Sequence, residues 1–377
     1  MREENRYPDE AAAPELSPAE TREAEAIERK KARRKRRRRR RLALLFLELV
    51  LLLLIGAGVY VVSKWNKIEK NEINVVVNPD IDKKTEEAMT GTTTLALFGV
   101  DSRDIKHKDK GVHGDVDMLL VIDNKTGEMK LASLYRDTLI AIDTENKLGK
   151  LTSAYFYGGA ENAVNMINRN FDLTIEDYVT VNWAAVAVAV NDLGGVEIDV
   201  TEEMLSYKNQ INGYILETVN GTGIPSTQIK HTGVQIADGI QAVAYCRVRY
   251  HAGDDVGRTR RQREVVRKLF DKVKKADPAT LNKLLDDVLP MVQTSLTESE
   301  VLKLVSLLPK LHFAEGGMEA FPKEANRRTF TYNKGAVQAP ETLVDVAGLL
   351  HTFLYGNESY TPSPMVKRLS TLIHNAK

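Results

Sequence analysis

The chain has 377 residues, of which 43% are apolar, so it can bury a sizeable core and form more than one structural unit. Its formal net charge is only +1, although the charges are very unevenly distributed. Cys246 is the only cysteine, which excludes an intrachain disulfide and a cysteine-based zinc site. The sequence has no HExxH, no phosphate-binding P-loop, no GxSxG elbow and no SxxK set with its companion motifs, so these enzyme classes are not indicated.

The first 62 residues predict a membrane anchor. Residues 1–28 carry nine acidic and three basic residues and are rich in Glu, Ala and Pro, a composition typical of disorder. Twelve of the thirteen residues 29–41 are Lys or Arg, and the apolar run 42–62 is long enough to cross a bilayer. A buried core helix and a cleaved signal peptide are the alternatives. The basic run at one end only, and the long polar lead, favour an uncleaved transmembrane helix.

The basic run also predicts orientation. Lys and Arg beside a span remain in the cytoplasm, so residues 1–41 are expected inside and everything after about residue 63 outside the cell membrane. Anionic lipid headgroups are the expected partner of this run, rather than nucleic acid. We therefore expect a single-pass membrane protein whose C-terminal part is extracytoplasmic.

After a polar connector over residues 63–93, a folded domain is expected to begin near Thr94. Apolar runs predict its first strands, and the tight turn 124–127 joins the second and third into a hairpin. The elements predicted are strands at 95–100, 118–123, 130–135, 179–182 and 196–200, and helices at 160–171 and 183–193. Residues 201–231 show no firm period and are expected to be an insertion or flap.

The second half continues this alternation. It predicts a helix over 237–243, a strand over 245–250 and a long helix over 260–275; then helices at 278–288, 298–308 and 340–354, with strands at 319–321 and 328–332. Strands that alternate with helices favour an α/β/α layered domain around a central mixed sheet. We assign residues 94–275 to this catalytic domain and residues 276–377 to a C-terminal extension packed on it.

Two arginines lie within the predicted strand at 245–250. Arg247 and Arg249 would share one face of that strand. Two such charges about 4 Å apart repel by roughly 4 kcal/mol at an effective dielectric of 20, unless an anion lies between them. Guanidinium forks match phosphate oxygens, so the pair could clamp a pyrophosphate. The alternative is a solvated basic face paired with Asp254 and Asp255.

The long helix that follows carries more arginines. Arg258 and Arg261 are three residues apart and therefore lie on one helical face, whereas Arg260 points elsewhere. They would add to the same anion site.

Two carboxylates stand at predicted strand ends. Asp101 follows the first strand and Asp115 precedes the second, on either side of one loop. Two carboxylates beside a bound phosphate make a suitable Mg²⁺ site, because Mg²⁺ takes oxygen ligands and keeps several waters. Capping of the loop is the alternative function of these aspartates.

At these residues the chain resembles the LytR-CpsA-Psr family of bacterial envelope proteins. The resemblance covers residues 94–270 in order. The matching segments are LALFGVDSR (95–103), GDVDMLLVID (114–123), LASLYRDTLI (131–140), KLTSAYFYGGAENAV (150–164), DYVTVNW (177–183), NDLGGVEIDV (191–200) and QAVAYCRVRYHAGDDVGRTRRQREVV (241–266).

The resemblance implies an enzyme that moves a phosphate-linked glycopolymer, such as teichoic acid or capsule, from a polyprenyl-pyrophosphate carrier to a peptidoglycan hydroxyl. It implies that Asp101 and Asp115 hold Mg²⁺ and act in catalysis with Arg136, Arg247 and Arg249. It further implies that the pyrophosphate is bound by Arg103, Lys150, Asp255, Arg258, Arg261 and Gln262.

The chain departs from the family at His113, where an arginine is usual. One pyrophosphate contact is then weaker or pH-dependent, or another arginine compensates. Two rival functions remain. One is a hydrolase that uses water to cleave the pyrophosphate lipid, and the other is a non-enzymatic regulator that binds such lipids. The apolar helix around residues 184–190 could line a tunnel for the isoprenoid, or be ordinary core.

Overall fold

The structure is a computed structural model that describes residues 60, 62–101, 111–206, 210–249 and 254–377. The predicted tail (1–41), most of the predicted anchor (42–62) and Arg103 lie outside these residues. Within the described part of the chain, no helix is long and apolar enough to cross a membrane. Residues 64–377 form one compact unit.

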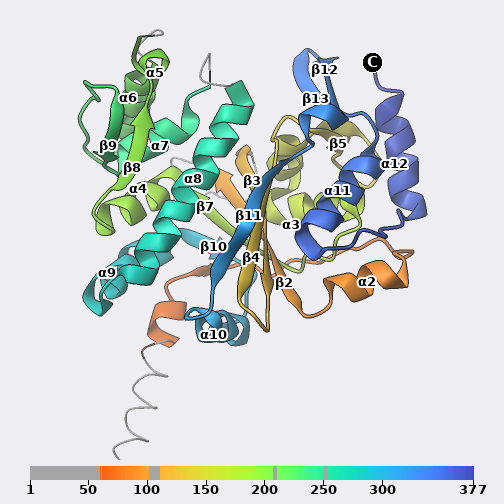
Figure 1. Ribbon diagram of the computed structural model, residues 1–377, viewed down its shortest axis with the longest axis horizontal. Helices are drawn as coiled ribbons and strands as arrows, with labels where there is room; N and C mark the ends of the chain where they lie inside the picture. Colours follow the sequence, from red (N-terminus) through yellow and green to blue (C-terminus); the bar gives the residue numbers. More distant parts are fainter. Residues whose placement is uncertain (1–59, 61, 102–110, 207–209, 250–253) are drawn as a thin grey trace, which may run out of the picture. The chain divides into compact units, whose positions relative to one another are not determined.

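A mixed sheet lies at the centre of this unit, as the sequence predicts (Figure 1). Over the described residues its seven strands are ordered β1-β10-β7-β2-β3-β4-β11, with β1–β10, β2–β7 and β4–β11 parallel and the other pairs antiparallel. Their bounds are β1 Glu69–Lys70, β2 Thr92–Val100, β3 Gly114–Asp123, β4 Glu128–Leu134, β7 Asp177–Asn182, β10 Val292–Thr294 and β11 His312–Phe321.

The predicted hairpin is present as β3 and β4. The amide of Gly127 donates to the carbonyl of Asp123 and closes the turn at 2.9 Å. Gly127 has a φ of +77°, and a Cβ there would lie 2.8 Å from the backbone of Lys310, so only glycine fits. The hairpin places the start of β3 and the end of β4 at the same edge of the sheet.

Helices cover both faces of the sheet. On one face, α3 (Leu151–Phe171), α11 (Leu343–Tyr355) and α12 (Pro364–His374) close a continuous apolar core over β2, β3 and β4. Figure 1 shows these three helices together on one side of the strands. We call this side the closed face. Its fully buried side chains include Leu119, Tyr155, Phe171 and Leu350.

The other face is covered by α4 (Trp183–Asp192), α7 (Gly239–Arg247) and α8 (Asp254–Lys275). With α6 (Gln210–Thr222) and the hairpin of β8 (Val196–Val200) and β9 (Gly233–Ala237), these helices enclose a second core. We call this side the open face. A Cβ at Gly239 would lie 1.9 Å from the carbonyl oxygen of Ala187, so α7 and α4 pack backbone to backbone at this glycine.

The smaller elements complete the unit. They are α2 (Lys83–Met89), β5 (Leu139–Ala141), β6 (Leu148–Lys150), α5 (Glu202–Ser206), α9 (Pro278–Val288), η2 (Leu289–Met291), α10 (Glu298–Leu307), η3 (Glu324–Asn326), β12 (Arg327–Tyr332) and β13 (Gly335–Pro340).

Three predictions of local structure need correction. The connector 63–93 is not featureless, because it supplies β1 and α2 and buries Trp65. The flap at 201–231 contains α5 and α6. The strand at 245–250 is wrong, since α7 continues to Arg247. The buried side chains Tyr245 and Val248 are three residues apart, a spacing typical of a helix. The alternation of apolar and polar residues in the sequence therefore fits a strand and a helix equally well.

The C-terminal extension is part of the same sheet. Its strand β10 pairs with β7 and its strand β11 pairs with β4, on opposite sides of β2 and β3. Helices α11 and α12 then pack on α3. Residues 64–377 therefore form one compact unit, with no division at the predicted boundary at residue 275.

Candidate functional site

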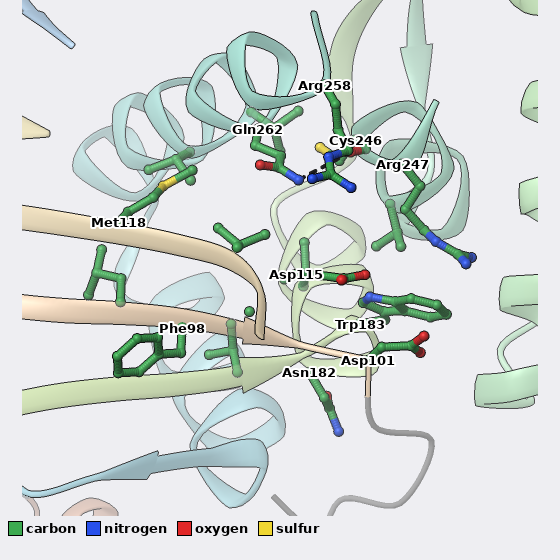
Figure 2. Close-up of a pocket in the computed structure, with 18 of the residues that line it drawn as sticks. Phe98, Asp101, Asp115, Met118, Asn182, Trp183, Cys246, Arg247, Arg258 and Gln262 are labelled. Atoms are coloured by element: carbon green, nitrogen blue, oxygen red, sulfur yellow. Dashed lines mark hydrogen bonds between the residues drawn. The ribbon is translucent and has the colours of Figure 1, made fainter. Parts of the chain in front are cut away.

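A cavity of about 560 Å³ lies between the sheet and the helices of the open face (Figure 2). Its interior is apolar. It is lined by side chains of β2, β3, β7, α4, α7 and α8, including Leu97, Met118, Val179, Val181, Val186, Val243, Val265, Val266 and Leu269. Val186 belongs to the helix that the sequence offered as a possible tunnel wall. A space of this kind suits a flexible apolar chain.

Charged side chains gather where β2 ends and β3 begins. Asp101 follows β2, Asp115 is the second residue of β3, and Arg136 follows β4; all three line the cavity. The Arg136 guanidinium forms an ion pair with the Asp115 carboxylate. The antiparallel pairing of β2 with β3 and of β3 with β4 brings these three positions to one edge of the sheet. Both aspartates therefore lie in the lining of one cavity.

Helix α8 contributes a second group of cations at the same mouth. The Asp255 carboxylate lies 3.1 Å from Nη2 of Arg258 and 3.9 Å from Nε of Arg249. Arg258 is only 4% exposed, and burial lowers its pKa while the charge of Asp255 opposes that effect. Gln262, one turn further along α8, also lines the cavity and donates to the carbonyl of Cys246 at 3.4 Å.

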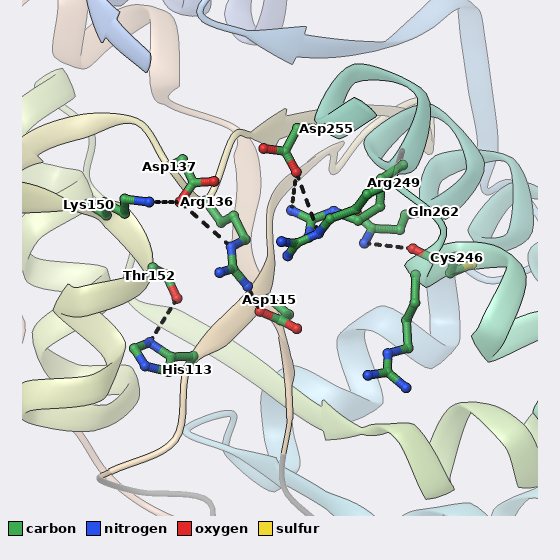
Figure 3. Close-up of polar contacts among 12 residues, drawn as sticks. His113, Asp115, Arg136, Asp137, Lys150, Thr152, Cys246, Arg249, Asp255 and Gln262 are labelled. Carbon is green, nitrogen blue, oxygen red and sulfur yellow. Dashed lines mark hydrogen bonds and ion pairs between the residues drawn. The ribbon is translucent and has the colours of Figure 1, made fainter. Parts of the chain in front are cut away.

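Each group of cations contains an aspartate, Asp137 beside Arg136 and Asp255 beside Arg249 (Figure 3). Asp137 accepts an ion pair from Lys150 at 2.7 Å and lies 3.8 Å from Nε of Arg136. The hydrogen bond with Lys150 and the charge of Arg136 outweigh burial and lower the pKa of Asp137. Burial raises the pKa of the neighbouring Asp255 carboxyl. Lys150 thus acts on the mouth through Asp137, which the sequence gave no specific role.

Arg247 and Arg261, both predicted to face a pyrophosphate, lie in different surroundings. Arg247 lines the cavity mouth and stacks over the ring of Trp183. Arg261 is 1% exposed and donates to the carbonyls of Tyr245 and Val248. Arg261 is not among the described residues that line the cavity, and these two bonds tie the segment that carries Arg247 and Arg249 to α8.

His113 and Cys246 also line the cavity. Nδ1 of His113 lies 3.3 Å from Oγ1 of Thr152, and the imidazole stacks on Phe156 with the ring centroids 4.7 Å apart. His113 is thus held at the position where the family usually has an arginine. Burial raises the pKa of the Cys246 thiol to about 12, so it stays protonated and is not a nucleophile.

Asp117 is a charged residue near the site to which the sequence gave no role, and it directly precedes the predicted strand at 118–123. It is 2% exposed, and it stands opposite Phe98 and Leu134, which both belong to the core of the closed face. Neither of its carboxyl oxygens has a hydrogen-bond partner among the residues that the structure describes. Burial, followed by the charge of Asp115, raises its pKa to about 8.

The donor set at the mouth fits magnesium bound together with a phosphate. Within the described residues, no cluster of three or more His, Cys, Asp or Glu side chains could hold a metal ion. Asp101 and Asp115 both face the cavity, and Mg²⁺ commonly takes one or two carboxylates while substrate phosphate and water supply its other ligands. The pair therefore suits an ion that binds with its substrate rather than a closed protein cage.

The chain matches a known protein family. The LytR_cpsA_psr family model matches residues 58–338. The chain belongs to the LytR-CpsA-Psr family. This match extends past residue 275, in agreement with the single compact unit that the structure shows.

Individual proteins and solved structures are also similar to this chain. The chain is 27% identical to the polyisoprenyl-teichoic acid–peptidoglycan teichoic acid transferase TagU of Bacillus cereus, over 66% of the chain and 77% of the relative. It is 29% identical to TagU of Enterococcus faecalis over 48% of the chain, which is about half (53%) of that relative's length. The solved structure of YwtF (TagT) with bound octaprenyl pyrophosphate lipid aligns with a TM-score of 0.51 at 19% identity, covering 75% and 99% of the two chains, and shows the shared fold.

Proposed function

We propose that this protein transfers a phosphate-linked glycopolymer, such as teichoic acid or capsule, from a polyprenyl-pyrophosphate carrier to a hydroxyl of peptidoglycan, with Mg²⁺. One observation carries the proposal: a single cavity joins an apolar interior to a mouth lined by Arg136, Arg247, Arg249 and Arg258 and by two carboxylates. The relatives named as teichoic acid transferases and the lipid-bound structure of YwtF support the same substrate class.

The chemistry of the donor suggests how it lies. Its isoprenoid would occupy the apolar interior, where burial contributes roughly 25 cal/mol per Å² of apolar surface. Its pyrophosphate would lie at the mouth, where planar guanidinium groups can take phosphate oxygens in pairs. The glycan would then extend away from the cavity. This arrangement leaves the glycan-side phosphorus at the polar edge of the sheet.

Transfer then requires alignment and charge stabilisation. A sugar hydroxyl of the acceptor attacks the glycan-side phosphorus. The bond between this phosphorus and the bridging oxygen breaks, and polyprenyl phosphate leaves with that oxygen. The arginines stabilise the charge that develops on the phosphoryl oxygens. Asp101 and Asp115 would hold Mg²⁺, which supplies charge neutralisation. One of these carboxylates accepts the proton of the attacking hydroxyl.

Membrane attachment belongs to the same proposal. A span over residues 42–62, with residues 1–41 in the cytoplasm, would keep the domain outside the cell and beside the membrane that holds its lipid donor. The peptidoglycan acceptor lies on that side of the membrane. Anchor, donor and acceptor would thus share one compartment.

Reconstitution tests the proposal. The full chain in detergent is incubated with a synthetic polyprenyl-pyrophosphate oligosaccharide and a peptidoglycan oligomer, with and without Mg²⁺, and products are followed by mass spectrometry. We expect a glycan-phosphate adduct on the peptidoglycan. Arg249→Ala should reduce its rate at least about 100-fold, because removal of one charge-stabilising donor typically costs 10²–10³. Arg327→Ala, which removes an arginine stacked on Tyr135 away from the cavity lining, is the matched control.

The rival functions give other products. Free glycan phosphate without an adduct would show a hydrolase that uses the same site. Binding of the lipid with no turnover of any glycan would favour a regulator. Either result would overturn the transferase proposal.

A further inference from the structure

Arg247 is bound differently from the other arginines of the cavity mouth. Its guanidinium carbon lies 3.6 Å from the ring centroid of Trp183 in α4 and 4.7 Å from that of Tyr214 in α6. Its Nη1 donates to Oγ1 of Thr218 at 3.1 Å, and its Nη2 donates to Oε1 of Glu217 at 2.8 Å. Arg136, Arg249 and Arg258 instead pair with aspartates of β3, α8 and the loop after β4.

These contacts determine where Arg247 can take an anion. The aromatic rings lie against the guanidinium group, so an anion must approach in its plane, through the N–H groups. A planar fork accepts two phosphate oxygens side by side along one edge. The edge formed by the two terminal nitrogens already donates to Glu217 and Thr218. The Glu217 carboxylate therefore takes Nη2, one of the two terminal donors that phosphate oxygens would use.

The exposure of the two partners indicates which one moves. The Arg247 side chain is 15% exposed and is held by two rings, whereas the Glu217 side chain is 44% exposed. Half-exposed ion pairs contribute at most a small stabilisation, because water competes for both charges. A cation–π contact at a desolvated site is worth as much or more. A pyrophosphate also carries more negative charge than one carboxylate, so Glu217 gives way while Arg247 stays in place.

We propose that Glu217 of α6 occupies the anion-binding edge of Arg247 in the free protein and must be displaced by the donor pyrophosphate. Glu217 thereby lowers donor affinity and makes α6 a specificity-determining element of the mouth. This inference rests on the proposed function, because it requires that the mouth bind a pyrophosphate. Neither Glu217 nor α6 could be identified from the sequence, which shows no firm period across residues 201–231.

The test measures binding of geranylgeranyl pyrophosphate to the full chain in detergent by titration calorimetry at low salt. Glu217→Gln keeps the shape of the side chain and removes its charge, so we expect two- to fivefold tighter binding. The gain should shrink at high salt, where surface charges are screened. Glu203→Gln is the matched control, because Glu203 is an exposed glutamate on the adjacent α5 and its replacement changes the net charge equally.

A double-mutant cycle with Arg247→Ala makes the test specific. If Glu217 acts through Arg247, Glu217→Gln should leave affinity unchanged in the Arg247→Ala background. An equal gain in both backgrounds, or in Glu203→Gln, would show a general charge effect and overturn the inference. Weaker binding by Glu217→Gln would show that Glu217 holds Arg247 in place, and would also overturn it. If the wild-type chain does not bind the lipid, the proposed function itself fails.

Discussion

The two faces of the central sheet are built from the same strands but differ in how tightly they are packed. On the closed face, α3, α11 and α12 fill the space over β2, β3 and β4 with fully buried side chains. On the open face, α4, α7 and α8 leave a cavity of about 560 Å³ whose apolar lining includes the half-buried Leu97, Val179 and Val186. The same hydrophobic pattern thus fills the closed face completely and leaves a cavity on the open face.

This difference follows from what each face has to contact. Side chains that meet a close-packed helix layer gain both burial and dispersion contacts. Side chains that line a cavity lose part of those contacts until a ligand fills it. The open face is therefore expected to contribute less to stability and more to binding than its composition alone suggests. Substitutions of the same chemistry on the two faces should separate these contributions.

The largest expected effect comes from truncating matched leucines. Leu350 of α11 is fully buried on the closed face, so Leu350→Ala should lower the free energy of unfolding by about 2–5 kcal/mol. Leu269 of α8 lines the cavity and is only partly buried, so Leu269→Ala should cost about 1 kcal/mol. Chemical denaturation of the two full-length variants measures both values. Equal losses would mean that the two faces do not differ in packing.

Asp117 offers a pH-dependent view of the closed face. Burial raises its folded-state pKa from 3.8 to about 8, so between these values the folded protein keeps a proton that the unfolded chain has lost. Stability due to this group is then fully present below about pH 4 and decreases as pH rises towards 8. The isosteric Asp117→Asn variant has no such proton to lose.

The stability difference between Asp117→Asn and wild type should therefore grow with pH. One proton per molecule changes the free energy of unfolding by about 1.4 kcal/mol per pH unit, or about 2.7 kcal/mol between pH 5 and pH 7. Denaturation of both proteins at these two pH values, without added metal, measures it. A constant difference would mean that Asp117 is ionised in the folded protein and that its surroundings are more polar than the structure shows.

Much of the fold and half of the site's geometry could be predicted from local sequence. The β3–β4 hairpin follows from two apolar runs around a glycine turn, and this turn alone brings Asp115 and Arg136 to one edge. Asp101 joins them because β2 ends there. The positions of these residues follow from where neighbouring strands begin and end, and the periodicity of the sequence indicates those points.

The rest depends on contacts between distant segments. The pairing of β10 with β7 and of β11 with β4 joins residues more than a hundred positions apart, and no local pattern indicates such partners. Arg261 is turned inward by the carbonyls of Tyr245 and Val248, although helical spacing placed it beside Arg258. Glu217 lies in a segment whose glycine and asparagine residues conceal the helix α6. Tertiary packing decides these positions, and local spacing does not.

Filling the cavity should have the smallest effect on the fold and a selective effect on binding. Val186 lines the cavity from α4, and a larger ring at this position would occupy the space expected to hold the isoprenoid. We expect Val186→Trp to weaken binding of geranylgeranyl pyrophosphate at least about tenfold, or about 1.4 kcal/mol, with the affinity for inorganic pyrophosphate unchanged. The control is Val234→Trp, at an exposed valine of β9. Because the new ring fills an existing space, the melting temperature should remain within a few degrees of wild type.

If Val186→Trp bound the lipid as tightly as wild type, the apolar chain would lie elsewhere, and the open face would not be its binding site. If both ligands bound more weakly, the ring would have disturbed the mouth as well, and the apolar and charged parts of the cavity could not be treated as separate sites.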